Sequence, residues 1–168
     1  KAVAFSPDGS QVAVGYHDST RVDVVDGSSL QTNFSADTRG VDNGSLSSVV
    51  WSADGRTLAA AGRWDAGKRD IKGKFPVRMW PDAGRGQPRD VPTVGSTVGA
   101  IAALPKGRWL LGATDPAWGV LEADGRWRAL GMAPTADLRG SRGAEAFLLG
   151  AGGRQVQFGF EPFGRPPH

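Results

Sequence analysis

Short apolar runs alternate with glycine-containing turns along the whole chain, and the same arrangement recurs at nearly regular intervals. Each recurrence has an apolar run, a tight turn and a second apolar run. Glycine readily supplies the positive φ angle that a tight turn requires, so each recurrence predicts two buried strands joined by a hairpin. The turn glycines are Gly9, Gly55, Gly107 and Gly153, at spacings of 46, 52 and 46 residues. The paired runs are 2–5 with 11–15, 48–51 with 57–62, 100–104 with 109–113, and 145–149 with 155–159.

A third apolar run and a more polar fourth run follow each of the first three hairpins. The third runs are 21–25, 77–81 and 119–123, and the fourth runs are 30–34, 88–92 and 126–130. No segment has helical periodicity over three turns. A repeated four-strand unit of roughly 45–50 residues, apolar inside and polar at its outer strand, is the period of a β-propeller blade. We therefore expect an all-β fold of four-stranded antiparallel blades, over about residues 1–36, 45–93 and 97–134, with a half-blade at 143–168.

Two of the hairpin segments resemble the inner strands of WD-repeat propellers. They are VAFSPDGSQVAVG (3–15) and VVWSADGRTLAAAG (49–62), and VRMW (77–80) resembles the strand that usually ends in Trp-Asp. In this chain Pro81 stands where that Asp would be, and no Gly-His pair precedes a unit, so the hydrogen-bond network of well-formed WD repeats is expected to be absent. The resemblance implies a divergent, bacterial-style WD-repeat protein. It also implies a segment of a larger multidomain protein, since similar segments often follow signalling or effector domains.

The repeats are too few to close a ring. Three and a half blades fall short of the roughly four to eight of a typical propeller, and uncapped repeats expose an apolar face. We therefore expect the chain to form part of the ring, with the remaining blades on another segment or another chain. A self-paired dimer is the alternative.

Composition narrows the range of partners. The net charge is only +3, although 15 of the 20 basic residues are Arg. Nucleic-acid binders usually carry a stronger and more concentrated excess, so a nucleic-acid partner is not expected. The longest apolar stretch, VGAIAALP, is far shorter than the ~20 residues of a membrane-spanning helix. Cysteine is absent, which excludes disulfides and thiolate metal sites and fits a reducing, cytoplasmic compartment.

The loops after the second strands are the candidate binding surface, because loops held by rigid strands commonly carry function. The loop at 63–75 differs most from its counterparts, with a local net charge of +3 and aromatic residues near both ends. Aromatic residues and Arg dominate interface hot spots. A solvated hairpin without a binding role is the alternative for this loop. The predicted contact residues are Tyr16, Arg63, Trp64, Arg69 and Trp118.

Acidic residues recur three positions after a glycine in these loops. They are Asp18, Asp65 and Asp115. We expect their carboxylates to accept backbone N–H groups and so order the loops. The alternative is a ring of carboxylates around a central channel that binds a cation or a basic ligand. No calcium-loop string is present, and no metal or other cofactor is expected.

Motifs for catalysis are few. His17 lies beside Asp18, but no G-x-S-x-G elbow, H-E-x-x-H pair or phosphate-binding loop occurs. The sequence therefore favours a non-catalytic interaction or sensing module that presents loops to a protein partner or a small effector. The alternative is a propeller enzyme of the lactonase or hydrolase kind, with acids and His17 near the channel.

Overall fold

The fold is described from a computed structural model, which places residues 2–65, 74–114, 117–132, 136–137, 148–150, 155–157 and 161–162. These residues form three four-stranded antiparallel sheets and two short strand pairs. In each four-stranded sheet the strands follow one another in chain order, so each strand pairs with the next one along the chain. The all-β prediction is confirmed.

The strands lie close to the predicted runs. The first sheet contains β1 (Ala2–Phe5), β2 (Gln11–Gly15), β3 (Val22–Asp26) and β4 (Thr32–Ser35). The second contains β5 (Ser48–Trp51), β6 (Leu58–Ala61), β7 (Phe75–Trp80) and β8 (Arg89–Val94), with a 3-10 turn, η1 (Asp82–Gly84), between β7 and β8. The third contains β9 (Val98–Leu104), β10 (Arg108–Ala113), β11 (Ala117–Leu121) and β12 (Trp127–Met132).

Two further strand pairs follow. β14 (Leu148–Gly150) pairs with β15 (Gln155–Gln157), which places Leu149 opposite Val156 as expected for the fourth hairpin. β13 (Ala136–Asp137) pairs with β16 (Glu161–Pro162), a pairing that the sequence pattern does not predict.

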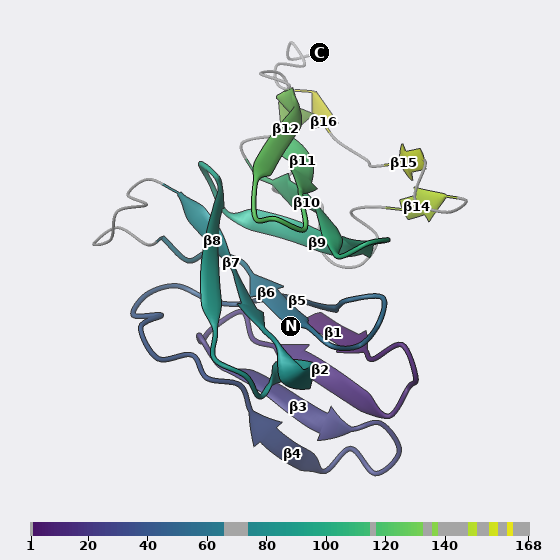
Figure 1. The fold of residues 1–168 in the computed structure, drawn as a ribbon. Coiled ribbons are helices and arrows are strands. Elements are labelled where there is room, and N and C mark those ends of the chain that lie inside the picture. Colours follow the sequence, from purple (N-terminus) through teal and green to yellow (C-terminus); the bar gives the residue numbers. More distant parts are fainter. Residues whose placement is uncertain are drawn as a thin grey trace, which may run out of the picture.

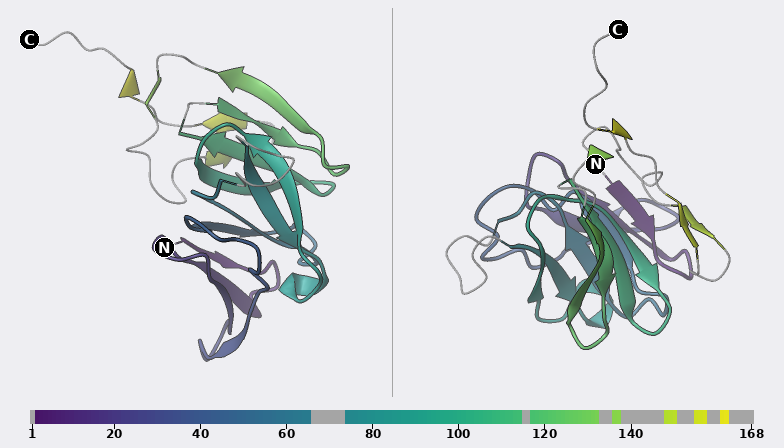
Figure 2. Two further views of the ribbon diagram at one scale, coloured as in Figure 1. Left: turned by 90° about the vertical axis from the view of Figure 1, so that its left-hand side faces the viewer. Right: turned by 90° about the horizontal axis from the view of Figure 1, so that it is seen from above.

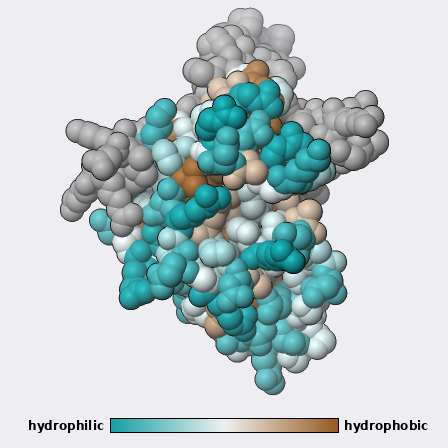
Figure 3. Space-filling model, in the orientation of Figure 1, coloured by the Kyte–Doolittle hydropathy of each residue, from teal (hydrophilic) through white to brown (hydrophobic). Residues whose placement is uncertain are grey.

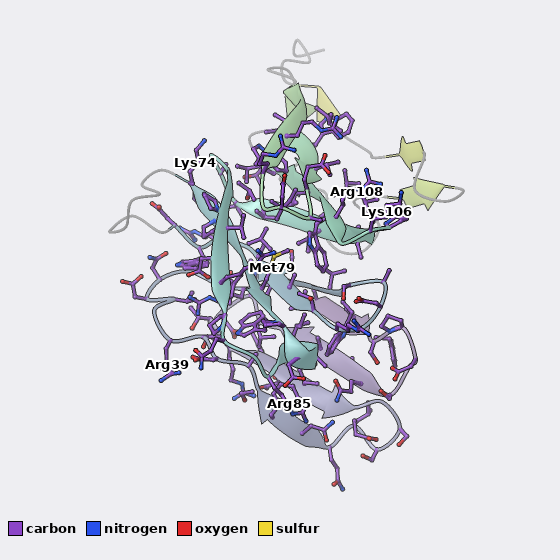
Figure 4. All side chains as sticks on the ribbon, viewed as in Figure 1. Arg39, Lys74, Met79, Arg85, Lys106 and Arg108 are labelled. Carbon is purple, nitrogen blue, oxygen red and sulfur yellow. The ribbon has the colours of Figure 1, made fainter. Side chains whose placement is uncertain are left out.

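The three large sheets are stacked one after another, with the β5–β8 sheet between the other two (Figures 1 and 2). One apolar core lies between the first and second sheets and includes Val24, Leu58 and Trp80. A second lies between the second and third sheets and includes Met79, Trp109 and Leu121 (Met79 is labelled in Figure 4). Both faces of the middle sheet are therefore buried, which explains the unbroken apolar run of β6, in which all four residues are buried.

The hairpin turns of the first two sheets share one hydrogen-bond pattern. In the first, the Ser6 hydroxyl donates to Asp8 Oδ1 over 2.6 Å and accepts the Gln11 N–H over 2.9 Å. In the second, Ser52 donates to Asp54 over 2.6 Å and accepts the Thr57 N–H over 2.9 Å. The recurring Ser-x-Asp-Gly phrase is thus a self-bonded turn.

These turns predict a loss of stability in acid. Hydrogen bonds from Ser6 and then Ser10 hold the pKa of Asp8 at about 2, below its ordinary value. A carboxylate whose pKa is lowered in the folded state stabilises the fold when the pH is above its ordinary pKa. That stabilisation is lost as the pH falls from the ordinary pKa of 3.8 to the folded-state pKa of about 2. We expect the thermal unfolding midpoint to fall from about pH 5 to about pH 2, and to fall less in Asp8→Asn. The control Asp18→Asn, which alters an exposed carboxylate outside the turns, should keep the original profile. An unchanged profile in Asp8→Asn would contradict this account.

Candidate partner-binding site

The antiparallel strand order brings the loops after the second strands and the segments between sheets to one end of the molecule. We call residues 16–21, 36–47 and 62–65 the loop face; they gather on the left of Figure 1, and the hairpin turns lie on the other side. The loop at 16–21 connects β2 to β3, residues 36–47 connect β4 to β5, and residues 62–65 follow β6. Each of these segments is therefore anchored at a strand of a packed sheet.

Trp64 lies beneath the loop face and not on it. Only 1% of its surface is exposed, and it belongs to the core between the first two sheets. Its ring stacks on the buried guanidinium of Arg78, with Cζ 5.0 Å from the ring centroid, and its Nε1 has no hydrogen-bond partner among the described residues. The expectation of an exposed Trp64 is wrong, because the segment 36–47 folds over this part of β6 and β7 and the indole fills the space below it.

Arg78 connects the second sheet to the segment that precedes it. It is 2% exposed, and it donates to both carboxylate oxygens of Asp90 over 2.6 and 2.8 Å. Its Nη1 also donates to the carbonyl oxygens of Asp37 and Arg39, over 3.3 and 2.9 Å. The Trp80 indole N–H donates to the same Asp37 carbonyl over 2.8 Å. This arrangement of Arg78, Asp90 and Trp80 joins the second sheet to the segment that leads out of the first.

The loop after β6 is fastened to the segment between sheets by a reciprocal pair. Asn43 Nδ2 donates to the Asp65 carbonyl over 2.8 Å, and the Asp65 N–H donates to Asn43 Oδ1 over 3.2 Å. The Ser45 N–H donates to the Arg63 carbonyl over 3.0 Å. Gly44 is required between them, since it has a φ of 71° and a Cβ there would lie 1.5 Å from the Arg63 carbonyl oxygen. Arg63 is exposed on this fixed backbone, and the bonds described for Asp65 come from its backbone.

Tyr16 is also held in place. Its hydroxyl donates to Asp23 Oδ2 over 2.7 Å, and Arg21 lies over its ring with Cζ 4.9 Å from the centroid. Arg21 Nε donates to the same carboxylate over 2.8 Å. Burial raises the pKa of Asp23, but hydrogen bonds from Ser35, Tyr16 and Arg21 outweigh that effect and lower it overall. The side chains of Tyr16 and Arg21 therefore form one ordered unit at the edge of the loop face.

The remaining predicted residues are placed differently. His17 and Asp18 are exposed at the tip of the loop after β2. Trp118 is half-buried on β11 opposite Gly131 of β12, and its indole covers that glycine, where a Cβ would lie 2.2 Å from the ring nitrogen. Arg69 and Asp115 lie outside the described residues.

The opposite end of the molecule holds an open groove of about 750 Å³ between the turns of the first two sheets. The groove is lined by Ser6, Asp8, Trp51, Asp54, Arg56 and Asp82, among others. Asp8 and Asp54 bond to their own turns, as described above. Hydrophilic side chains cover most of the face seen in Figure 3. Arg39, Arg85 and Lys106 lie on loops and turns, and Arg108 lies at the start of β10 (Figure 4).

The described residues contain neither a metal-binding cluster nor a membrane-spanning helix. No three His, Asp or Glu side chains of this part of the chain gather where they could hold a metal ion. None of the helices in the same ranges is long and apolar enough to cross a membrane.

Comparison with solved structures identifies the architecture. The chain matches the Myceliophteria thermophila Cps50 (Swd1) β-propeller domain with a TM-score of 0.64 and 15% identity, over 95% of this chain and 48% of that one. It matches the WD40 repeats of RRP9 with a TM-score of 0.62 and 15% identity, over 76% of this chain and 35% of that one. It also matches Kuenenia stuttgartiensis hydrazine synthase with a TM-score of 0.60 and 16% identity, over 76% of this chain and 34% of that one.

The chain thus has the fold of a partial WD40-type β-propeller and spans less than half the length of these three structures. No family model and no curated protein sequence matches it.

Proposed function

We propose that this chain is a non-catalytic interaction module that binds a protein partner through the loop face. The observation that carries the proposal is the way Arg63 and Tyr16 are held. Arg63 is exposed on a backbone fixed by Asn43 and Ser45, and Tyr16 is fixed by Asp23. Tyr and Arg are the residue types most often found in interface hot spots. Side chains ordered before binding lose less entropy when a partner binds.

The positive charge of the segment from 63 to 75 favours an acidic partner surface. Arg21 and Arg63 are exposed on the loop face. The sequence from 63 to 75 has a local net charge of +3, and it contains Arg69, which we include as a contact residue together with Trp118. Complementary charge chiefly raises the association rate and suppresses wrong partners. Effector sensing and assembly into a larger multidomain protein belong to the same proposal.

The test reverses one charge on the loop face. Arg63→Glu should weaken capture of the partner from a lysate by about tenfold or more, the scale of an interface hot spot. Arg56→Glu is the matched control, because Arg56 is exposed on the β5–β6 turn at the opposite end of the molecule. It should capture the same protein at the original level. Equal capture by the two variants would overturn the loop face as the binding site.

The same preparation distinguishes the propeller-enzyme alternative. A lactonase or hydrolase activity that is lost in both His17→Asn and Asp18→Asn would contradict a non-catalytic module. Both residues are exposed, so these substitutions test the chemistry with little effect on the core.

A further inference from the structure

The chain contains two asparagines, and one of them precedes a glycine. Asn33 is followed by Phe34 on β4, whereas Asn43 is followed by Gly44 in the segment between β4 and β5. Both asparagines are exposed. The backbone nitrogen of the next residue can attack an asparagine side-chain amide, and glycine has no Cβ to hinder that approach. Exposure is therefore similar at the two positions, and position 43 is the more reactive of the two.

The fold requires the glycine that makes this position reactive. Gly44 has a φ of 71°, and a Cβ there would lie 1.5 Å from the Arg63 carbonyl oxygen. No residue in the part of the chain that the structure describes accepts a hydrogen bond from the Gly44 N–H. The nitrogen can therefore lose its proton without breaking a bond of the fold, and its approach to the amide is unhindered.

The Asn43 amide is held by a donor at the atom where charge develops. Attack on the amide carbon places negative charge on Oδ1, and this oxygen accepts the Asp65 N–H over 3.2 Å. A donor already oriented towards such an oxygen lowers the barrier to its formation. The Nδ2 group, which is lost in the reaction, donates to Asp42 Oδ1 over 2.9 Å and to the Asp65 carbonyl over 2.8 Å.

We propose that Asn43 deamidates spontaneously in the folded protein and that the product releases the loop after β6. The Gly44 nitrogen loses its proton to solvent and bonds to Asn43 Cγ. The Cγ–Nδ2 bond breaks, and Nδ2 takes up a proton from solvent and leaves as ammonia. Water then adds to either carbonyl of the resulting cyclic succinimide and breaks that carbonyl's bond to the Gly44 nitrogen. The products are aspartate and isoaspartate at position 43.

Neither product can restore the reciprocal pair with Asp65. A carboxylate at position 43 has no proton to donate, yet the Asp65 carbonyl and the Asp42 carboxylate, both acceptors, face the place of Nδ2. Isoaspartate also adds a carbon to the backbone before Gly44, which has no spare space beneath the Arg63 carbonyl. Because ammonia is lost, the change is one-way. The inference does not rest on the proposed function, since it concerns bonds within the chain and is measured without a partner.

The rate of deamidation can be compared at the two asparagines of one folded sample. The protein is incubated at neutral pH and then cleaved after arginine, which places Asn33 on the peptide 22–39 and Asn43 on the peptide 40–56. Mass spectrometry follows the loss of the amide, and an isoaspartate-specific methyltransferase detects isoaspartate. Deamidation at position 43 should be at least about tenfold faster than at position 33. Equal rates, or the same change of the peptide 40–56 in Asn43→Gln, would overturn the proposal.

Amide hydrogen exchange measures the release of the loop. Deamidated molecules carry an additional negative charge, so ion exchange separates them from the original. The Ser45 N–H, which donates to the Arg63 carbonyl over 3.0 Å, should exchange at least about fivefold faster in the deamidated molecules, the scale of one hydrogen bond. The Gly9 N–H, which donates to the Ser6 carbonyl over 2.9 Å at the opposite end of the molecule, is the internal control and should be unchanged.

Two substitutions give the same test without separating the products. Asn43→Asp should reproduce the faster exchange at Ser45, and the matched control Asn33→Asp, also at an exposed asparagine, should leave it at the original rate. Exchange at Ser45 that stays unchanged in both the deamidated molecules and Asn43→Asp would overturn the release of the loop. Equal acceleration by the two variants would overturn it as well, because it would follow from charge alone.

Discussion

Replacing Arg78 with leucine is expected to lower the free energy of unfolding by about 3–5 kcal/mol, which is the cost of breaking a buried ion pair from one side. The substitution leaves the carboxylate of Asp90, whose side chain is 11% exposed, without its bidentate partner. It also removes the donor that joins the Asp37 and Arg39 carbonyls to the second sheet. The first and second sheets would then be joined mainly by apolar contacts.

Chemical denaturation of four proteins measures this effect: the original, Arg78→Leu, Asp90→Leu and the double variant. The double variant should lose less than the sum of the two single losses, because it leaves neither charge buried alone. Glu122→Gln provides the control, since its partner Arg128 is 56% exposed and an exposed pair contributes about 0–1 kcal/mol. A loss in Arg78→Leu as small as in Glu122→Gln would contradict the account of the buried pair.

Trp64→Ala is expected to destabilise the protein by about 3–5 kcal/mol, the usual cost of truncating a large aromatic residue in a core. The indole fills the space between the first two sheets, and its removal also takes away the ring that stacks on Arg78. The midpoint of denaturation by urea measures the change. A loss below about 1 kcal/mol would show that the space is not filled by this side chain.

Two conservative substitutions separate packing from hydrogen bonding. Trp64→Phe loses no hydrogen bond described in the structure, whereas Trp80→Phe removes a donor that bonds the Asp37 carbonyl over 2.8 Å. Trp80→Phe should therefore cost more than Trp64→Phe, by roughly the 0.5–1.5 kcal/mol of one hydrogen bond. The same comparison shows why Trp64→Ala is a poor test of binding. Any loss of partner binding by Trp64→Ala would follow from the loss of the fold.

The hairpins and their order could be predicted because local chemistry determines them. The Ser-x-Asp-Gly turn satisfies its own hydrogen bonds within six residues, so its signature is visible in a short window of sequence. The apolar runs on both sides are unbroken where both faces of a sheet are buried. The conformation of the turn between β7 and β8 was not predictable in this way, because Asp82 and Ala83 in η1 have positive φ angles of 53° and 49°. It is held by a bond from the Ala83 N–H to the Arg56 carbonyl, which is distant in sequence.

The candidate site was predictable only in part, because exposure depends on segments far apart in the chain. Trp64 lies between Arg63 and Asp65, and such a polar context favours a surface position. It is buried because residues 36–47 cover it. The pairing of Arg78 with Asp90 likewise depends on strand register, which the apolar pattern does not specify for a buried charge. Tyr16 and Arg63 were predicted as contact residues from loop position and residue type alone, and in that role they stay predictions.

The contact of Arg78 and Trp80 with the segment between sheets has a consequence for the evolution of this chain. Both side chains bind carbonyl oxygens at positions 37 and 39, and any residue supplies a carbonyl. Mutations can therefore accumulate at positions 37 and 39 without weakening the contact between this segment and the second sheet, whereas Arg78, Trp80 and Asp90 must be retained together. Relatives of this protein should be recognisable by Arg78, Trp80 and Asp90 on two adjacent strands more readily than by overall sequence identity. Sequence identity is expected to fall at positions where only the backbone makes the contact.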